Sequence, residues 1–277
     1  RVWPLSFSEY ISASPLSVRD AWKEYYTYGG LPQIMQMNTD EKKIDYLRNL
    51  YELTYLKDII DRHHLRNEKG MRQILQVLAS SIGSSTNPRR LSNTFQSVED
   101  VSIKESTIKE YIGHIQDAFM IEESLRFDVK GRKYIGTETK YYFSDMGLRA
   151  VALNFRQQEE NHIMENIIYN ELRMRGYLVD VGMVETWKRD ENGKNKQVNL
   201  EVDFVVNKGS ERIYIQSAYR MPTGEKESQE HRPLLHINDN FKKIIIVGDD
   251  IKPKTDEQGI KTIGLFDFLL DSKSLDI

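Results

Sequence analysis

The sequence predicts an α/β protein of several domains, and three observations along the chain support this fold class. Apolar residues recur at helical spacing through residues 1–60. Residues 61–150 hold three helix-like segments followed by two strand-like segments, and from about residue 155 one helix precedes a series of strands. We therefore expect a helical linker or lid (1–60), a winged helix-turn-helix domain (61–150) and a mixed α/β domain (151–277).

The N-terminal segment carries clear helix signals. Ser6 can cap a short helix, with Glu9 at the position that completes a capping box. The next helix, "SVRDAWKEYYTY", ends at Gly29 and Gly30, which are natural helix stops. The stretch "DEKKIDYLRNLYELTYLKDIIDRH" then spaces its apolar residues as one face of a helix, so it predicts one long helix.

The second segment has the order of a winged helix-turn-helix domain. Helices are expected at "EKGMRQILQVLASSIG", "NPRRLSNTFQ" and "KESTIKEYIGHIQDAFMI", and strands at "MIEESLRFD" and "KYYFSD". In such domains the third helix enters the major groove of DNA. The cations that could contact nucleic acid come from the helices and from the hairpin "VKGRKY": Arg89, Arg90, Lys104, Lys109, Lys130, Arg132 and Lys133. The segment has only 14 Lys and Arg against 12 Asp and Glu, so DNA and protein partners both stay open.

The pattern of the last segment predicts a helix followed by the strands of an α/β domain. A helix at "HIMENIIYNELRMRGY" is closed by Gly176. Strands are expected at "LVDVGMVETWKR", "LEVDFVVN", "RIYIQSAY" and "KKIIIVGDD", and a final strand and helix at "IKTIGLFDFLL".

Acids in this segment are arranged as in a metal-dependent nuclease of the PD-(D/E)XK type. Such a site needs carboxylates to hold Mg²⁺ and a Lys that helps to activate water. Glu165 or Glu171 on the helix and Asp203 on a strand could supply carboxylates, and strand alternation puts Glu201 on the same face as Asp203. The alternative is that Glu201 and Asp203 form the solvated side of the strand.

The following strand departs from this pattern. Gln216 and Ala218 occupy the positions where an acid and a Lys are needed. Gln216 offers a neutral oxygen and Ala218 offers no donor, so we expect a vestigial, inactive site of Glu165, Asp203 and Gln216. If the site were active, Glu165 and Asp203 would hold the metal.

The composition limits which functions and cellular locations are compatible with the sequence. The net charge is -3 and the pI is near 6.1, which argues against a strongly basic nucleic-acid binder. There is no cysteine, no Walker A motif, and no apolar run long enough to cross a membrane. Neighbouring His63 and His64 would point about 100° apart on a helix, so they cannot share a metal. We expect a cytoplasmic protein with no membrane partner.

The ordered segments resemble a known family. "PLSFSEY", "YYTYGGLPQIM", "YLKDIIDRH", "KYYFSDMGLR", "ENIIYNELRMRGY", "EVDFVV", "YIQSAY" and "RPLLHINDNFKKIIIV" are similar to the C-terminal part of bacterial and archaeal AAA-type (P-loop) ATPases that carry the domain of unknown function 4143. The resemblance spans essentially the whole chain. It implies a missing N-terminal ATPase module that binds ATP and Mg²⁺, no cofactor in this chain, and a C-terminal restriction-endonuclease-like fold. Residue by residue, it matches Glu165 to the helix acid, Asp203 to the strand acid, and Gln216 and Ala218 to the acid-x-Lys positions.

The resulting functional hypothesis is a regulatory and interaction region of an ATPase. It would bind DNA or a protein partner without cutting and would not be catalytic by itself. Two alternatives remain: an active Mg²⁺-dependent nuclease, and a purely protein-interacting adaptor.

Overall fold

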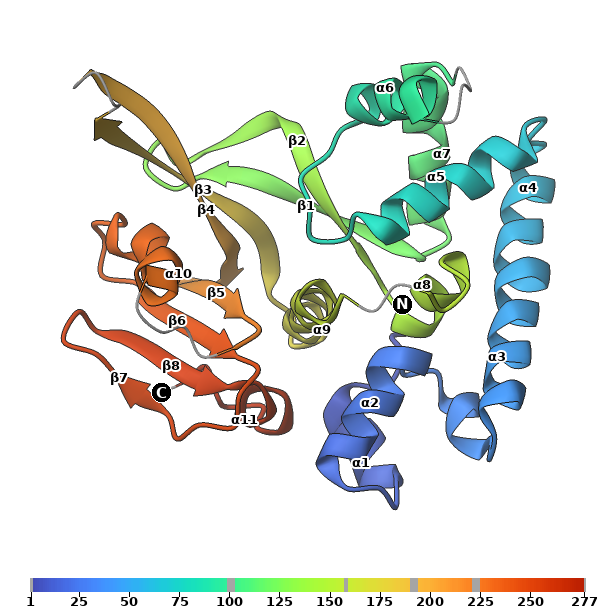
Figure 1. Ribbon diagram of the computed structural model, residues 1–277, viewed down its shortest axis with the longest axis horizontal. Coiled ribbons are helices and arrows are strands. Elements are labelled where there is room, and N and C mark those ends of the chain that lie inside the picture. The colour runs from blue at the N-terminus through green and yellow to red at the C-terminus, as the bar shows by residue number, and fades with distance from the viewer. Residues whose placement is uncertain (1, 99–102, 157–158, 190–193, 221–224, 277) are drawn as a thin grey trace. The chain divides into compact units, whose positions relative to one another are not determined.

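The computed structural model describes every residue except 1, 99–102, 157–158, 190–193, 221–224 and 277. It is a mixed α/β structure with a mostly helical N-terminal part and a large mixed sheet, which confirms the predicted class (Figure 1). Its internal contacts form two compact units. The first comprises Arg1–Glu123 and Lys140–Ile167, and the second comprises Ser124–Thr139 and Ile168–Ile277.

The first unit begins with two short α-helices, both predicted, and a 3-10 helix that was not predicted. They are α1 (Phe7–Ala13), α2 (Val18–Tyr28) and the 3-10 helix η1 (Pro32–Gln36). The predicted capping box is confirmed, because the Ser6 hydroxyl accepts from the backbone N–H of Glu9 and the Glu9 carboxylate accepts from the N–H of Ser6. Gly29 ends α2 with a φ of 82°, which favours glycine.

The predicted long helix is continuous but not uniform. It consists of α3 (Asp40–Asn49), a π-helical segment η2 (Leu50–Leu56) and α4 (Lys57–His63). Leu47, Leu56 and Ile59 are buried along it. The π-helical geometry, with its wider i to i+5 hydrogen bonding, was not foreseen from the spacing.

The first unit also contains α5 (Glu68–Ser80), α6 (Pro88–Val98), α7 (Glu105–Asp117) and α8 (Met146–Ala152). The first three match the predicted segments, and Ile108, Ile112 and Ile115 of α7 are buried as expected. α8 was not predicted from the sequence, and it packs against α2, α3 and α5.

The sheet has eight strands in the order β2-β1-β3-β4-β5-β6-β8-β7. Their bounds are β1 Ile121–Asp128, β2 Lys133–Phe143, β3 Leu178–Arg189, β4 Asn195–Lys208, β5 Glu211–Ala218, β6 Lys242–Val247, β7 Lys254–Thr255 and β8 Ile260–Gly264. β3, β4 and β5 are antiparallel neighbours, and β5, β6 and β8 are parallel neighbours. The two strands expected as a wing lie at one end of this order, and β1 pairs in parallel with β3. β2 starts earlier than predicted, so Gly136 lies within the strand.

Three further helices are α9 (Glu160–Met174), α10 (Glu225–Leu235) and α11 (Leu265–Leu270). α10 packs on β4 and β5, and α11 packs on β6 and β8. α10 was not predicted from the sequence; it contains Pro233, a residue that is unfavourable inside a helix.

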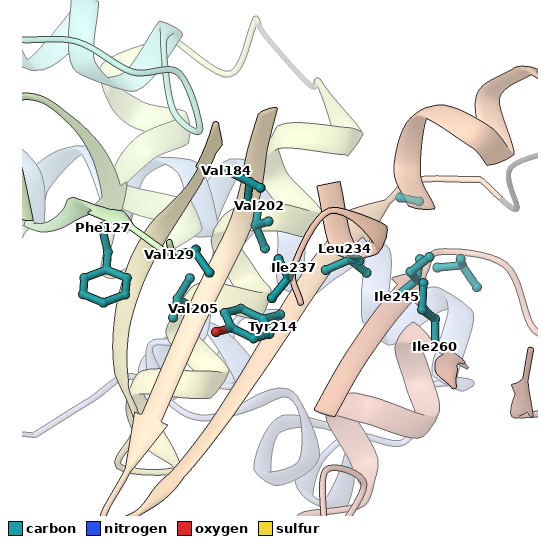
Figure 2. Close-up of a cluster of buried hydrophobic side chains, with 12 residues drawn as sticks. Phe127, Val129, Val184, Val202, Val205, Tyr214, Leu234, Ile237, Ile245 and Ile260 are labelled. Carbon is teal, nitrogen blue, oxygen red and sulfur yellow. The ribbon is translucent and has the colours of Figure 1, made fainter. Parts of the chain in front are cut away.

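An apolar cluster forms the core between α10 and the strands of the second unit. Figure 2 shows Val205 and Tyr214, from neighbouring strands, side by side within it. Its members are Phe127, Val129, Val184, Val202, Val205, Tyr214, Ala218, Leu234, Ile237, Ile245, Val247 and Ile260.

A β-bulge in β4 brings Val202 and Val205 into this same cluster. Asp180 pairs with Val205 and Gly182 pairs with Val202, so two residues of β4 lie opposite one residue of β3. This is a β-bulge, and it lets residues three apart share a face. A Cβ atom on Gly182 would come within 2.8 Å of a Val205 methyl and 2.9 Å of the Val202 Cβ, so the close approach requires glycine. Asp203 lies inside the bulge.

Candidate functional site

Two of the predicted nuclease-like residues, Asp203 and Gln216, lie side by side on β4 and β5. The backbone pairs of these strands run from Lys208 with Glu211 to Phe204 with Ile215. Just beyond the last pair, the Gln216 side-chain oxygen accepts from the Asp203 N–H at 3.4 Å, and an Asp203 carboxylate oxygen accepts from the Ser217 N–H at 2.8 Å. The two side chains therefore extend the hydrogen bonding between the strands through the bulge.

Gln216 also links the sheet to α10. Its side chain hydrogen-bonds the carboxyl of Glu230 on that helix. Burial raises the pKa of Glu230 above its usual range, and the hydrogen bond from Gln216 and the charge of His231 oppose this shift. Asp203 and Gln216 are each only 9% exposed, so both side chains are largely buried and held by hydrogen bonds. Glu230 was not predicted as a site residue, because nothing in its local sequence relates it to Gln216.

The position expected to carry the catalytic Lys belongs to the core. Ala218 is 5% exposed and is a member of the apolar cluster that includes Val202 and Leu234. A lysine side chain at this position would have to be accommodated among these apolar side chains, and burying its ammonium there is unfavourable. The strand thus departs from the acid-x-Lys pattern in packing as well as in residue type.

These residues do not fit a Mg²⁺ ion. Mg²⁺ prefers near-octahedral coordination by carboxylate oxygens and water. Here an Asp203 oxygen already accepts a backbone N–H, Gln216 is neutral with its oxygen also engaged, and Ala218 has no donor. Within the part of the chain that the structure describes, no group of three or more His, Asp or Glu side chains is arranged to hold a metal ion.

Glu165, the predicted helix acid, has partners of its own in the first unit. One of its carboxylate oxygens accepts from the Lys140 ammonium at 2.9 Å and from the Tyr142 hydroxyl at 2.7 Å. Lys140 is 2% exposed, so the pair is a buried ion pair. Gly83 leaves space for it, since a Cβ there would lie 2.8 Å from the other Glu165 oxygen. Glu171, the alternative acid, pairs with Arg175 at 2.6 Å in the second unit.

The predicted nucleic-acid contacts fall into two groups. In the first unit, Arg89 and Arg90 of α6 are exposed, as are Lys104 and Lys109 at the start of α7. In the second unit, the other three are exposed: Lys130 and Arg132 in the turn between β1 and β2, and Lys133 at the start of β2.

A buried carboxyl in the first unit was also missed. Asp145 caps α8, and its two oxygens accept from the N–H groups of Gly147, Leu148 and Gly30. Burial raises the pKa of Asp145 to about 6, against the lowering effect of these hydrogen bonds. It borders a cavity of about 200 Å³ that Trp3 and Tyr55 also line.

Histidines separated in sequence meet in the first unit. His63 stacks on His114 with ring centroids 3.6 Å apart, a contact that the sequence did not predict.

None of the helices described has the length and apolar character needed to cross a bilayer.

Comparisons with known proteins place the chain in a family. It is 32% identical over 275 residues to an uncharacterized protein of Haemophilus influenzae, covering 98% of this chain and 64% of that protein. It is 22% identical over 240 residues to the uncharacterized protein MJ1544 of Methanocaldococcus jannaschii, covering 82% of this chain and 51% of that protein. The chain therefore spans less than two thirds of the length of either relative.

The crystal structure of protein VC1899 from Vibrio cholerae is similar over 86% of this chain and 56% of its own, but with 10% identity and a TM-score of 0.29. A sequence profile described as "Domain of unknown function (DUF8612)" matches residues 19–159, about half of the chain. The chain belongs to this DUF8612 family.

Proposed function

We propose that this chain is the regulatory and interaction region of a P-loop ATPase. In this proposal a winged-helix part and a nuclease-like α/β part bind nucleic acid or a protein partner without cutting it. The proposal that an ATPase module belongs to the same protein is supported by the family resemblance of the ordered segments. Both relatives are considerably longer than the matched region, and the additional length is enough for a further module.

The observation that carries the non-cutting half is the use of Asp203 and Gln216 as hydrogen-bond partners of the backbone. A nuclease needs these positions free to hold a cation. Here they join β4 to β5, and Ala218 packs in the core.

The nucleic-acid half is supported by the order of α5, α6, α7, β1 and β2 and by the exposed cations on them. Phosphate contacts from Lys and Arg release counterions, so binding weakens steeply with salt. Titrating a labelled DNA duplex with the chain at several salt concentrations should give a linear fall of log affinity with log salt. Absence of any salt-dependent binding would remove this half and leave a protein partner.

A charge-matched pair of variants locates the contact. Arg89→Gln with Arg90→Gln should weaken duplex binding and reduce the salt slope by about two phosphate contacts, or about 1.8. Lys42→Gln with Arg48→Gln removes the same charge from exposed positions of α3 and should leave the slope unchanged. Equal effects from both pairs would contradict a specific contact through α6.

Cleavage is tested separately with supercoiled plasmid in Mg²⁺ or Mn²⁺. We expect no nicking above the background without protein. Nicking that EDTA stops and Asp203→Ala removes would overturn the non-cutting proposal in favour of an active nuclease.

A further inference from the structure

Four aromatic side chains and one arginine contact one another in a row in the second unit. We call it the aromatic stripe and define it by Tyr134, Phe127, Arg212, Phe241 and Tyr214. The Tyr134 and Phe127 rings meet edge to face at 5.6 Å, and the Arg212 guanidinium lies 5.1 Å from the Phe127 ring and 5.5 Å from the Phe241 ring. Phe241 then meets Tyr214 at 6.4 Å. Strands β1, β2 and β5 and the segment before β6 all contribute.

Hydrogen bonds hold the stripe in place. The Tyr134 hydroxyl donates to Asp180 at 3.2 Å, and the Tyr214 hydroxyl donates to Asp239 at 2.6 Å. The Arg212 Nε donates to Asn207 at 2.9 Å. Rings held in this way lose little conformational entropy when a ligand stacks on them.

The stripe is open to solvent at two rings. Tyr134 is 60% exposed and Phe241 is 40% exposed, although both are large apolar groups. Isolated exposed apolar residues are common, but these two exposed rings are connected through the buried Phe127 ring and the Arg212 guanidinium, which fixes their positions relative to each other.

Cations border the aromatic stripe on the Tyr134 side. Lys130 and Arg132 are exposed in the turn before β2, and Lys133 is the exposed first residue of β2, next to Tyr134. The Lys130 ammonium also donates to the Glu185 carbonyl oxygen at 2.5 Å. The two acids bonded to the stripe, Asp180 and Asp239, each bind a tyrosine hydroxyl. The charges of Arg173 and Arg212 also act on Asp180.

We infer that the aromatic stripe binds single-stranded nucleic acid. Tyr134 and Phe241 would stack on bases, and Lys130, Arg132 and Lys133 would contact phosphates. In a duplex the base faces are covered by neighbouring base pairs, whereas a single strand offers them to aromatic rings. Exposed aromatic rings beside clustered cations combine base stacking with phosphate contacts, as single-strand binding requires. A protein partner would not require the phosphate contacts.

The inference rests on the nucleic-acid half of the proposed function but uses a different unit and a different substrate. Failure of duplex binding through α6 would leave single-strand binding intact. Failure at the stripe would leave duplex binding intact. Measuring both substrates on the same chain therefore tells the two failures apart.

The test is fluorescence anisotropy with a labelled oligothymidylate and a labelled duplex of equal length. We expect the whole chain to bind the single strand, and Tyr134→Ala and Phe241→Ala each to weaken that binding by roughly 5- to 100-fold. Tyr134→Phe keeps the ring and loses only the contact with Asp180, so it should bind nearly as the unaltered chain does. Tyr219→Ala is the matched control: Tyr219 is also exposed, but it lies beyond the far end of β5 from Arg212.

The salt dependence separates stacking from charge. Lys130→Gln with Lys133→Gln should lower the salt slope by about 1.4, two single-strand phosphate contacts, whereas Tyr134→Ala should leave the slope unchanged. Circular dichroism checks that each variant is folded.

Unchanged single-strand affinity in both Tyr134→Ala and Phe241→Ala would overturn the inference, as would an equal loss in Tyr219→Ala. A stripe that captures a purified protein partner but binds no oligonucleotide would overturn it as well.

Discussion

The buried pair of Lys140 and Glu165 predicts that Glu165→Ala destabilises the protein. The substitution removes the acceptor of both the Lys140 ammonium and the Tyr142 hydroxyl. Lys140 is 2% exposed and cannot regain its lost hydration without rearrangement. Removing the carboxylate paired with a buried lysine reduces the compensation of its charge, which lowers the free energy of unfolding.

The magnitude follows from the burial of both groups. Breaking a buried ion pair by removing one partner costs about 3 to 5 kcal/mol. For a cooperative unit of this size, each kcal/mol lowers the melting temperature by about 2 to 4 °C. We therefore expect a fall of about 10 °C, well above the error of a thermal melt.

Thermal and urea unfolding followed by circular dichroism would measure it. Glu165→Leu combined with Lys140→Met should be less destabilised than Glu165→Ala, because both charges of the pair are removed together. Glu110→Ala is the control: this glutamate is an exposed residue of α7, and its substitution should change stability by no more than about 0.5 kcal/mol. An unchanged or raised melting temperature in Glu165→Ala would refute this reasoning, since it is the behaviour of an acid held for catalysis at a cost in stability.

Three further substitutions test other parts of the fold. Gly182→Ala should cost about 1 to 3 kcal/mol of unfolding free energy in a urea titration because its Cβ has no space, whereas Gly113→Ala, with open surroundings, should not. Gln216→Glu should lower the melting temperature by placing a carboxylate against Glu230, and millimolar Mg²⁺ should restore part of the loss. Burial raises the pKa of Asp145 from 3.8 to about 6, so the folded state binds more protons than the unfolded state between these values. Its contribution to the unfolding free energy should therefore fall by about 2 kcal/mol as pH rises from about 4 to about 6, and urea titrations of Asp145→Asn should show a smaller fall.

Most helices were predictable because their signals are local. The apolar spacing of α5 and α7 and the capping residues of α1 suffice to place them. The sheet order was not predictable in this way. The parallel pairing of β1 with β3 brings Arg126 opposite Val181, more than fifty residues later, and nothing in either strand specifies that partner.

The site was only half predictable for a related reason. The sequence shows that Asp203 and Gln216 occur on successive strands, and the structure places them in contact. Strict alternation puts Val202 and Val205 on opposite faces, yet the bulge brings both into one core. A bulge is a property of two paired strands, so the spacing within one strand does not show it.

The two predicted acids illustrate how little a carboxylate on a strand or helix says about catalysis until its partners are known. Asp203 accepts a backbone N–H in a largely buried position, where losing that acceptor would cost about 1 to 3 kcal/mol. Glu165 neutralises a buried lysine. Each side chain thus has a structural role that is independent of any reaction, and each would be needed in a protein that never cut a phosphodiester bond. The distinguishing feature of an active site would instead be a carboxylate held close to others with its oxygens free for a cation, which is not how Asp203 and Gln216 are used.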